Sequence, residues 1–296
     1  MALAPTVAPF AFFAVLSSMG AGLASPGLVA VIARNVDSAR QDRAQAMVNA
    51  GVGPGLVAAG ALALFVLPDW RLAWTLVAIV TALAAAAVLV LDRPGAGPAE
   101  SRATAPPSRT WFHRHRVPFV SAVLLGAATA AVWTYGRSHL VAAGATERGS
   151  IAAWIALGAG GAAAIVTARG LSTLPATRAW AVTVGSVALA TVGLGVAAGS
   201  LPSALLACAV FGWGFTAATS ALITWATRID PDRAAGGTSL LFVALVLGQA
   251  LGSTAAGLLA EQQGLGPAFL ASAAVAATAA ALPVSVRGAD ARLPHG

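Results

Sequence analysis

Nine separate apolar stretches run through this chain, and each is long enough to cross a lipid bilayer. A transmembrane helix needs about 20 predominantly apolar residues to span the hydrocarbon core. The stretches that reach this length are 9–33, 45–67, 72–91, 117–136, 149–168, 179–198, 202–226, 236–259 and 265–286. Helices satisfy their own backbone hydrogen bonds, as the bilayer core requires. The sequence therefore predicts an all-α membrane protein, a polytopic bundle of nine transmembrane helices.

The composition excludes an ordinary soluble domain. Hydrophobic residues make up 58% of the chain and charged residues only 9%, whereas soluble domains average about 25% charged residues. The chain has a single cysteine, Cys208, so neither a disulfide framework nor a thiolate metal site can form. We expect no cofactor and no bound metal.

The basic residues, all of them Arg, alternate between the two sides of the predicted bundle. One side carries Arg34, Arg40, Arg43, Arg93, Arg102, Arg109, Arg114, Arg116, Arg169, Arg178, Arg228, Arg233, Arg287 and Arg292. The other side carries only Arg71, Arg137 and Arg148 of the 17 basic residues. Loops rich in Arg stay in the cytoplasm. The pattern predicts a protein of the cytoplasmic membrane, surrounded by lipid, with its C-terminus in the cytoplasm and its N-terminus outside.

The net charge of +7 does not indicate nucleic-acid binding, because the cations form no single patch. The use of Arg without any Lys is typical of a GC-rich bacterial genome. We expect membrane lipid and a small molecule as partners, and no nucleic acid.

One connection, residues 92–116, differs from the rest. It contains four Pro, several Gly and Ser, and a cluster of Arg and His, a composition that favours an extended or disordered linker. The predicted division is residues 1–91 with three helices, this cytoplasmic linker, residues 117–286 with six helices, and a cytoplasmic tail, 287–296. His113 and His115 could form part of a metal site, but we favour a surface cation cluster that touches anionic lipid headgroups.

Three features of the chain carry a family resemblance. The first is the turn from Arg40 to Arg43, which leads into a helix with Gly51, Gly53, Pro54, Gly55 and Gly60. The second is the Asp69-Trp70-Arg71 turn that opens the third apolar stretch, and the third is the linker followed by six helices. Together they resemble the major facilitator superfamily of secondary transporters, whose fifth helix carries a similar Gly-Pro antiporter motif. The resemblance implies helices 4–12 of that fold, with the first three helices missing.

The Gly-Pro cluster has a physical meaning that does not depend on the family. Glycines let a neighbouring backbone approach closely, and proline frees a carbonyl and bends the helix. A bent and tightly packed helix suits an interface that rocks during transport. Ordinary packing between membrane helices is the alternative interpretation.

Several polar and aromatic residues are candidates for contact with a substrate. They are Trp213, Thr216, Thr219, Gln249, Asn49, Tyr135 and Arg137. At 1.5 Å per residue, Trp213 lies about 17 Å from the outer end of its helix and Gln249 about 20 Å from the inner end of the next. Both are near mid-membrane, where an indole or amide N–H needs a partner. Hydrogen bonding between helices is the alternative role, and Arg137 could instead snorkel at the outer boundary.

The resemblance implies a secondary active transporter that moves a small molecule by alternating access, with the substrate near the midplane between two halves. Efflux is the favoured direction, with a coupling proton or cation as a further partner. A small-solute uptake permease and a truncated fragment without transport activity remain as alternatives. We expect no enzyme, because His139 lies at an outer helix end and has no evident nucleophile beside it.

Overall fold

In the computed structural model, residues 2–66, 69–92 and 108–290 are described, and they contain helices and no strand. The helices are α1 (Val7–Asn35), α2 (Ser38–Ala50), α3 (Val52–Val66), α4 (Trp70–Leu91), α5 (Arg109–Ala142), α6 (Glu147–Ser172), α7 (Ala176–Ala197), α8 (Leu201–Ile229), α9 (Ala234–Gln263) and α10 (Leu265–Asp290), with a 3-10 turn, η2 (Pro231–Arg233), before α9. The all-α prediction is confirmed; eight of the predicted apolar stretches each fall mainly on one helix, and the stretch 45–67 is divided between α2 and α3 as far as it is described.

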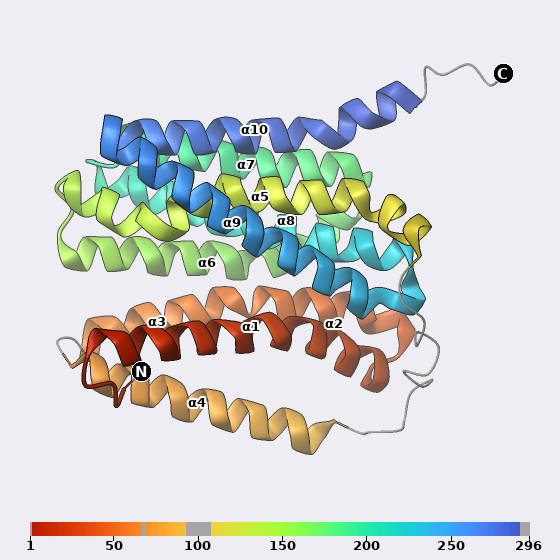
Figure 1. The fold of residues 1–296 in the computed structure, drawn as a ribbon, viewed down its shortest axis with the longest axis horizontal. Coiled ribbons are helices and arrows are strands. Elements are labelled where there is room, and N and C mark those ends of the chain that lie inside the picture. The colour runs from red at the N-terminus through yellow and green to blue at the C-terminus, as the bar shows by residue number, and fades with distance from the viewer. Residues whose placement is uncertain (1, 67–68, 93–107, 291–296) are drawn as a thin grey trace.

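The helices run back and forth along one direction, so that alternate connections meet at the same end of the bundle (Figure 1). We call one of these ends the Arg-rich end; its described arginines are Arg34, Arg40, Arg43, Arg109, Arg114, Arg116, Arg169, Arg178, Arg228 and Arg233. Among the residues that the structure describes, eight helical segments are long and apolar enough to cross a membrane, with α2 and α3 counted together. In α1, the shorter segment Val7–Ser17 is apolar. The chain is a multi-pass membrane protein.

The predicted bend near Pro54 is a break between α2 and α3. Pro54 has no N–H to donate to the carbonyl of Ala50, four residues earlier. Accordingly α2 ends at Ala50 and α3 begins at Val52. The Gly55 N–H donates to the Gly51 carbonyl at 3.1 Å, so helical hydrogen bonding resumes at once.

The predicted linker is shorter than expected at its C-terminal side, because α5 already begins at Arg109. The Ser108 hydroxyl accepts a hydrogen bond from the Trp111 N–H at 3.2 Å and caps the helix. One turn later the His115 ring stacks on Trp111 with 4.1 Å between centroids, and both side chains are buried. The prediction of an extended segment is wrong for residues 109–116, and His115 is not part of a surface cluster. The aromatic pair supplies buried area that the charge-based interpretation overlooked.

His113 stays exposed and pairs with Arg116 at 2.9 Å. Residues 93–107 of the predicted linker lie outside the described residues. At the other end of the chain, α10 continues to Asp290, so residues 287–290 of the predicted tail are helical, and residues 291–296 lie outside the described residues.

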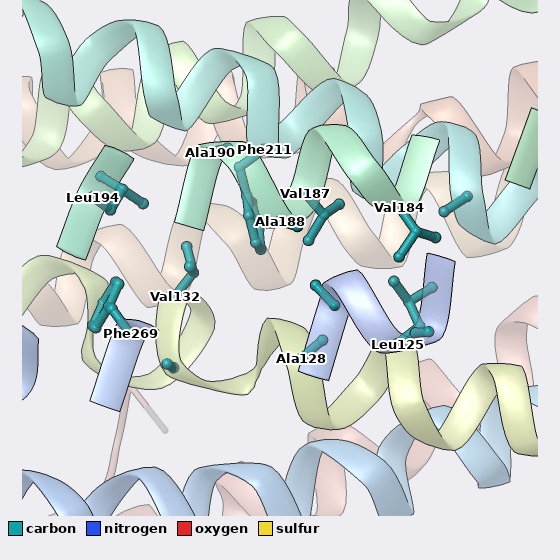
Figure 2. Close-up of a cluster of buried hydrophobic side chains, with 14 of the residues drawn as sticks. Leu125, Ala128, Val132, Val184, Val187, Ala188, Ala190, Leu194, Phe211 and Phe269 are labelled. Carbon is teal, nitrogen blue, oxygen red and sulfur yellow. The ribbon is translucent and has the colours of Figure 1, made fainter. Parts of the chain in front are cut away.

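The buried hydrophobic core belongs to the group α5–α10. Its members run from Ala122 to Ala279, and the largest are Trp180, Phe211 and Phe269, each at most 1% exposed. Figure 2 shows Phe211, Val187 and Leu194 facing Leu125, Val132 and Phe269 across this core.

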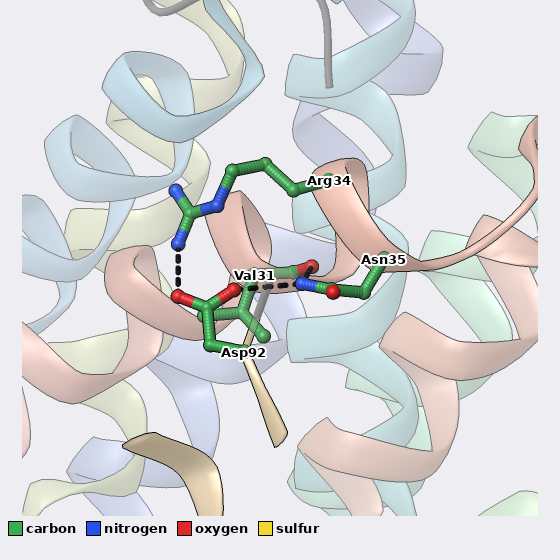
Figure 3. Close-up of polar contacts among 4 residues, drawn as sticks. All are labelled: Val31, Arg34, Asn35 and Asp92. Carbon is green, nitrogen blue, oxygen red and sulfur yellow. Dashed lines mark hydrogen bonds and ion pairs between the residues drawn. The ribbon is translucent and has the colours of Figure 1, made fainter. Parts of the chain in front are cut away.

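The group α1–α4 has a different character. None of the described residues of α4 is buried. At one end Phe10 of α1 makes edge contacts with Trp70 and Trp74 of α4, with centroids 5.8 and 6.2 Å apart. At the Arg-rich end, Arg34 pairs with Asp92 at 2.7 Å and the Asn35 amide donates to the same carboxylate at 2.8 Å (Figure 3). Helices α1 and α4 are therefore tied at both ends.

Candidate functional site

The two helix groups meet where α3 crosses α6. A Cβ atom on Gly53 would lie 2.3 Å from the Ala162 backbone N and 2.6 Å from the Gly158 carbonyl. A Cβ on Gly158 would in turn lie 2.7 Å from the Gly53 carbonyl. The two backbones therefore touch directly, and only glycine fits at either position.

The other residues of the Gly-Pro cluster do not share this contact. A Cβ on Gly60 would meet the flexible Ile155 side chain at 2.5 Å, and one on Gly51 would lie 3.0 Å from the Val48 carbonyl. A Cβ on Gly55 would have no atom within 4 Å, and Pro54 is exposed. Gly53 is thus the member that sets the α3–α6 distance.

The predicted turn from Arg40 to Arg43 is helical, because both residues lie within α2, and the two side chains have different surroundings. Arg40 is exposed near the start of α2, where its N–H donates to the Asp37 carbonyl at 2.8 Å. Arg43 lines a cavity that is described below.

A polar contact joins α2 to α8 beside the glycine crossing. The Asn49 amide nitrogen lies 2.6 Å from Ser220 Oγ, 3.1 Å from Thr219 Oγ1 and 3.2 Å from the Thr216 carbonyl. We call Asn49, Thr216, Thr219 and Ser220 the Asn49 cluster. Its threonines are buried, with 4% and 8% of their surface exposed, and the Thr219 hydroxyl donates to the carbonyls of its own helix.

The Asn49 cluster unites three of the predicted substrate-contact residues and adds one that the sequence analysis missed. Thr216, Thr219 and Ser220 stand at spacings of three and four residues, so they share one face of α8. This spacing of three and four residues is the sequence feature from which Ser220 could have been predicted. The cluster makes the interhelical hydrogen bonds that were the alternative role for these residues, and their contact with a substrate stays a prediction.

Trp213 lies on the same face of α8, three residues before Thr216. Its indole N–H donates to Thr167 Oγ1 of α6 at 2.8 Å. The expectation that a mid-membrane indole finds a polar partner is confirmed. The sequence analysis missed Thr167. A threonine inside an apolar stretch can donate its hydroxyl to a carbonyl of its own helix, so it gives no separate sequence signal. Thr167 does so with the Ala164 carbonyl at 3.2 Å.

The remaining candidates lie elsewhere. The Tyr135 hydroxyl of α5 donates to the Ser253 carbonyl of α9 at 3.1 Å. Arg137 donates to Ser150 Oγ at 3.2 Å and lies 3.8 Å from the Glu147 carboxylate, at the end opposite to the Arg-rich end. Gln249 is half-buried on α9, where its backbone N would be 2.8 Å from a Cβ on Gly126. None of the three has a described hydrogen bond to the Asn49 cluster.

A cavity of about 640 Å³ lies beside the Asn49 cluster, between α2, α6, α7 and α8. Ala50 and Ser220 belong to its lining, so the Asn49 cluster forms part of its border. Within the described residues there is no group of three His, Cys, Asp or Glu side chains that could hold a metal ion. His139 stacks on Phe269 with 4.5 Å between centroids and bonds to the Leu194 carbonyl at 2.9 Å, which is a packing role.

The site consists of two helix groups, a backbone crossing between them, a polar contact and a cavity. These features suit the binding of a ligand and the movement of one helix group relative to the other. In comparisons of the sequence, the family model of the Major Facilitator Superfamily matches residues 1–242, which run from α1 into α9 and include the glycine crossing and the Asn49 cluster. No curated protein matches the chain. Because the match covers most of the chain and the structure is an all-α membrane bundle, the chain belongs to the Major Facilitator Superfamily of transporters.

Proposed function

We propose that this chain is a secondary active transporter that moves a small molecule across the cytoplasmic membrane by alternating access, with efflux as its direction. One observation carries the proposal: the main cluster of buried hydrophobic residues lies within residues 122–279, and the group α1–α4 packs against it through limited contacts that include the glycine crossing, Leu56 and the Asn49 cluster. Two helix groups with a small shared apolar interface can rock against each other while most of the core of the larger group stays packed.

The side chains at this interface favour an uncharged or weakly polar substrate. Trp213, Asn49 and Ser220 offer an aromatic face, an amide and a hydroxyl, which suit a drug-like molecule or a hydrophobic metabolite. The Gly-Pro-Gly sequence at 53–55 supports efflux through its likeness to the antiporter motif of the family. A coupling proton or cation would supply the driving force.

A flux assay in oriented vesicles tests this proposal. The 296-residue chain is placed in inverted vesicles, and three probes of similar size are offered: chloramphenicol as the neutral probe, ethidium as the cation and fluorescein as the anion. We expect gradient-dependent accumulation of chloramphenicol above the level of empty vesicles. The Gly55→Ala variant is the active control, because its Cβ meets open space.

The other outcomes are also decisive. Accumulation in right-side-out vesicles alone would show an uptake permease. Absence of flux for all probes in both orientations, with the chain folded, would contradict the proposal and favour a transporter fragment without activity.

A further inference from the structure

The cavity of about 640 Å³ lies to one side of the contact between the helix groups. Helices α6 and α7 follow each other in sequence, yet α7 packs mainly against α8 and α10 and touches α6 little. The cavity occupies the space that this divergence leaves, with α2 and α8 as its other walls. Its volume falls within the roughly 300–1,000 Å³ that ligand pockets occupy.

The lining changes from charged to apolar with depth. Arg43, Arg169 and Arg228 line the cavity from three different helices, close to the Arg-rich end. One helical turn further inward on the same faces are Met47, Ile165 and Thr224, followed on α8 by Ala221 and Ala217. None of the described lining residues is acidic. A ligand that matches this gradient has an anionic head and an apolar tail.

The cavity opens toward the surface that faces lipid. Two of its lining residues, Ile165 and Val166, are 42% and 83% exposed on α6, the second of them among the most exposed large hydrophobic residues of the chain. In a membrane protein such residues contact acyl chains. The tail of a membrane lipid can therefore enter sideways, without passing through water.

We propose that this cavity binds an anionic phospholipid of the inner leaflet. The lipid phosphate contacts Arg43 and Arg228 at the rim, and one acyl chain lies along Ile165, Thr224 and Ala221. Basic pockets between transmembrane helices on the cytoplasmic side are suited to anionic headgroups, and the Arg-rich end is the predicted cytoplasmic end. Because Ser220 both lines the cavity and bonds Asn49, the bound lipid lies against the contact between α2 and α8.

Quenching of tryptophan fluorescence by brominated lipid tests the proposal. Trp225 lines the cavity on α8. Dibromo-phosphatidylglycerol, added to the purified chain in detergent, should quench a saturable part of the emission, and dibromo-phosphatidylcholine should do so far more weakly. Trp180 of α7 also lines the cavity, so the Trp225→Phe variant should lose a large part of the saturable signal and the remainder should come from Trp180. Native mass spectrometry counts the bound lipids without any tryptophan signal.

The charge requirement is tested with paired variants. Each cation near an anionic group contributes on the order of a fivefold factor in binding, so Arg43→Gln with Arg228→Gln should weaken phosphatidylglycerol binding by about tenfold or more. Arg178→Gln is the matched control, since Arg178 is exposed at the start of α7 and is not part of the lining. All three arginines are on or near the surface, and thermal unfolding checks that the variants fold.

The proposal would be overturned by equal binding of both lipids, by an equal loss with Arg178→Gln, by no loss with the double variant, or by saturable quenching that is undiminished in Trp225→Phe. Inorganic phosphate separates the two sources of the anion. It should not displace the lipid at millimolar concentration, and displacement would indicate a site for free anions instead. Binding is read without any flux measurement, so the result stands whether or not the chain transports the three probes.

Discussion

At the scale of single residues, polar side chains inside the bundle act mainly by joining helices. The Asn49 amide reaches three oxygens of α8, and the Trp213 indole reaches Thr167 of α6. In a membrane such bonds contribute about 0.6 kcal/mol on average and up to about 1.7 kcal/mol. Each such bond therefore contributes only a small part of the stability of the fold.

Replacing Asn49 by Ala should lower the unfolding free energy by about 1 kcal/mol, because α2 loses its polar contact with α8. The apparent unfolding temperature in detergent should fall by about 2 °C or slightly more. Ser220→Ala should have a smaller effect, since the amide keeps Thr219 at 3.1 Å. Equal unfolding temperatures for Asn49→Ala and the unchanged chain would show that this contact does not stabilise the structure.

The Trp213–Thr167 pair is suited to a double-mutant cycle. Thr167→Val leaves the indole N–H without its partner, and Trp213→Phe removes the indole. The double variant should be more stable than the sum of the two single losses predicts, with a coupling of about 0.5–1.5 kcal/mol. Thermal unfolding of the four proteins measures this coupling, and a coupling of zero would contradict the hydrogen bond.

At the scale of helices, close packing depends on which glycines face a neighbouring backbone. The sequence identified the Gly-Pro cluster as a packing element, and the structure shows that its members differ: Gly53 touches α6, while Gly55 faces open space. The sequence could not distinguish them, because the direction of a glycine relative to another helix depends on the tertiary packing. The partner glycine, Gly158, lies more than a hundred residues away in sequence.

Three alanine substitutions should separate these roles. Gly53→Ala places a Cβ 2.3 Å from the Ala162 backbone N, which no side-chain movement relieves, and should destabilise the protein by about 1–3 kcal/mol or prevent folding. Gly60→Ala should cost less, because the Ile155 side chain can move. Gly55→Ala should be neutral or stabilise by up to about 1 kcal/mol, since alanine favours the helix. Yield of monodisperse protein and unfolding temperature report the order, and a reversed order would contradict the α3–α6 crossing.

The start of α5 shows where sequence reasoning failed for a helix. Residues 109–116 are rich in Arg and His, and this composition indicated a solvated linker. Local contacts instead favour a helix in this segment. The Ser108 cap and the buried stack of Trp111 on His115 extend the helix to Arg109. Neither contact produces an apolar stretch, so a search based on hydropathy cannot find them.

At the scale of the whole molecule, the sequence predicted the class of fold and the grouping of arginines well. Apolar length predicted nine spans, of which eight have a qualifying segment within the described residues, and α1 has only the shorter Val7–Ser17. The alternation of Arg follows from the antiparallel path, which Figure 1 shows. The contacts between the two helix groups were harder to predict from the sequence. They include single glycines, one amide and scattered apolar contacts such as Leu56, which no sequence pattern marks. The side of the membrane that each end faces stays a prediction.

Cysteine labelling tests that orientation. In a Cys208→Ala background, which removes the one buried native thiol, Arg178→Cys at the Arg-rich end should react with an impermeant maleimide only in inverted vesicles. Arg148→Cys, exposed at the opposite end, should react only in right-side-out vesicles. The reverse pattern would invert the proposed direction of transport as well as the topology.

The most direct test of the account locks the two helix groups together. In the Cys208→Ala background, Asn49→Cys and Ser220→Cys place thiols where the native side chains approach within 2.6 Å, and a short reducible cross-linker joins them. We predict that chloramphenicol flux through the double-cysteine variant stops on cross-linking and returns on reduction, whereas the same treatment changes the flux of each single-cysteine variant little relative to that variant's own untreated flux. Undiminished flux through the fully cross-linked protein would contradict a mechanism in which α2 and α8 separate.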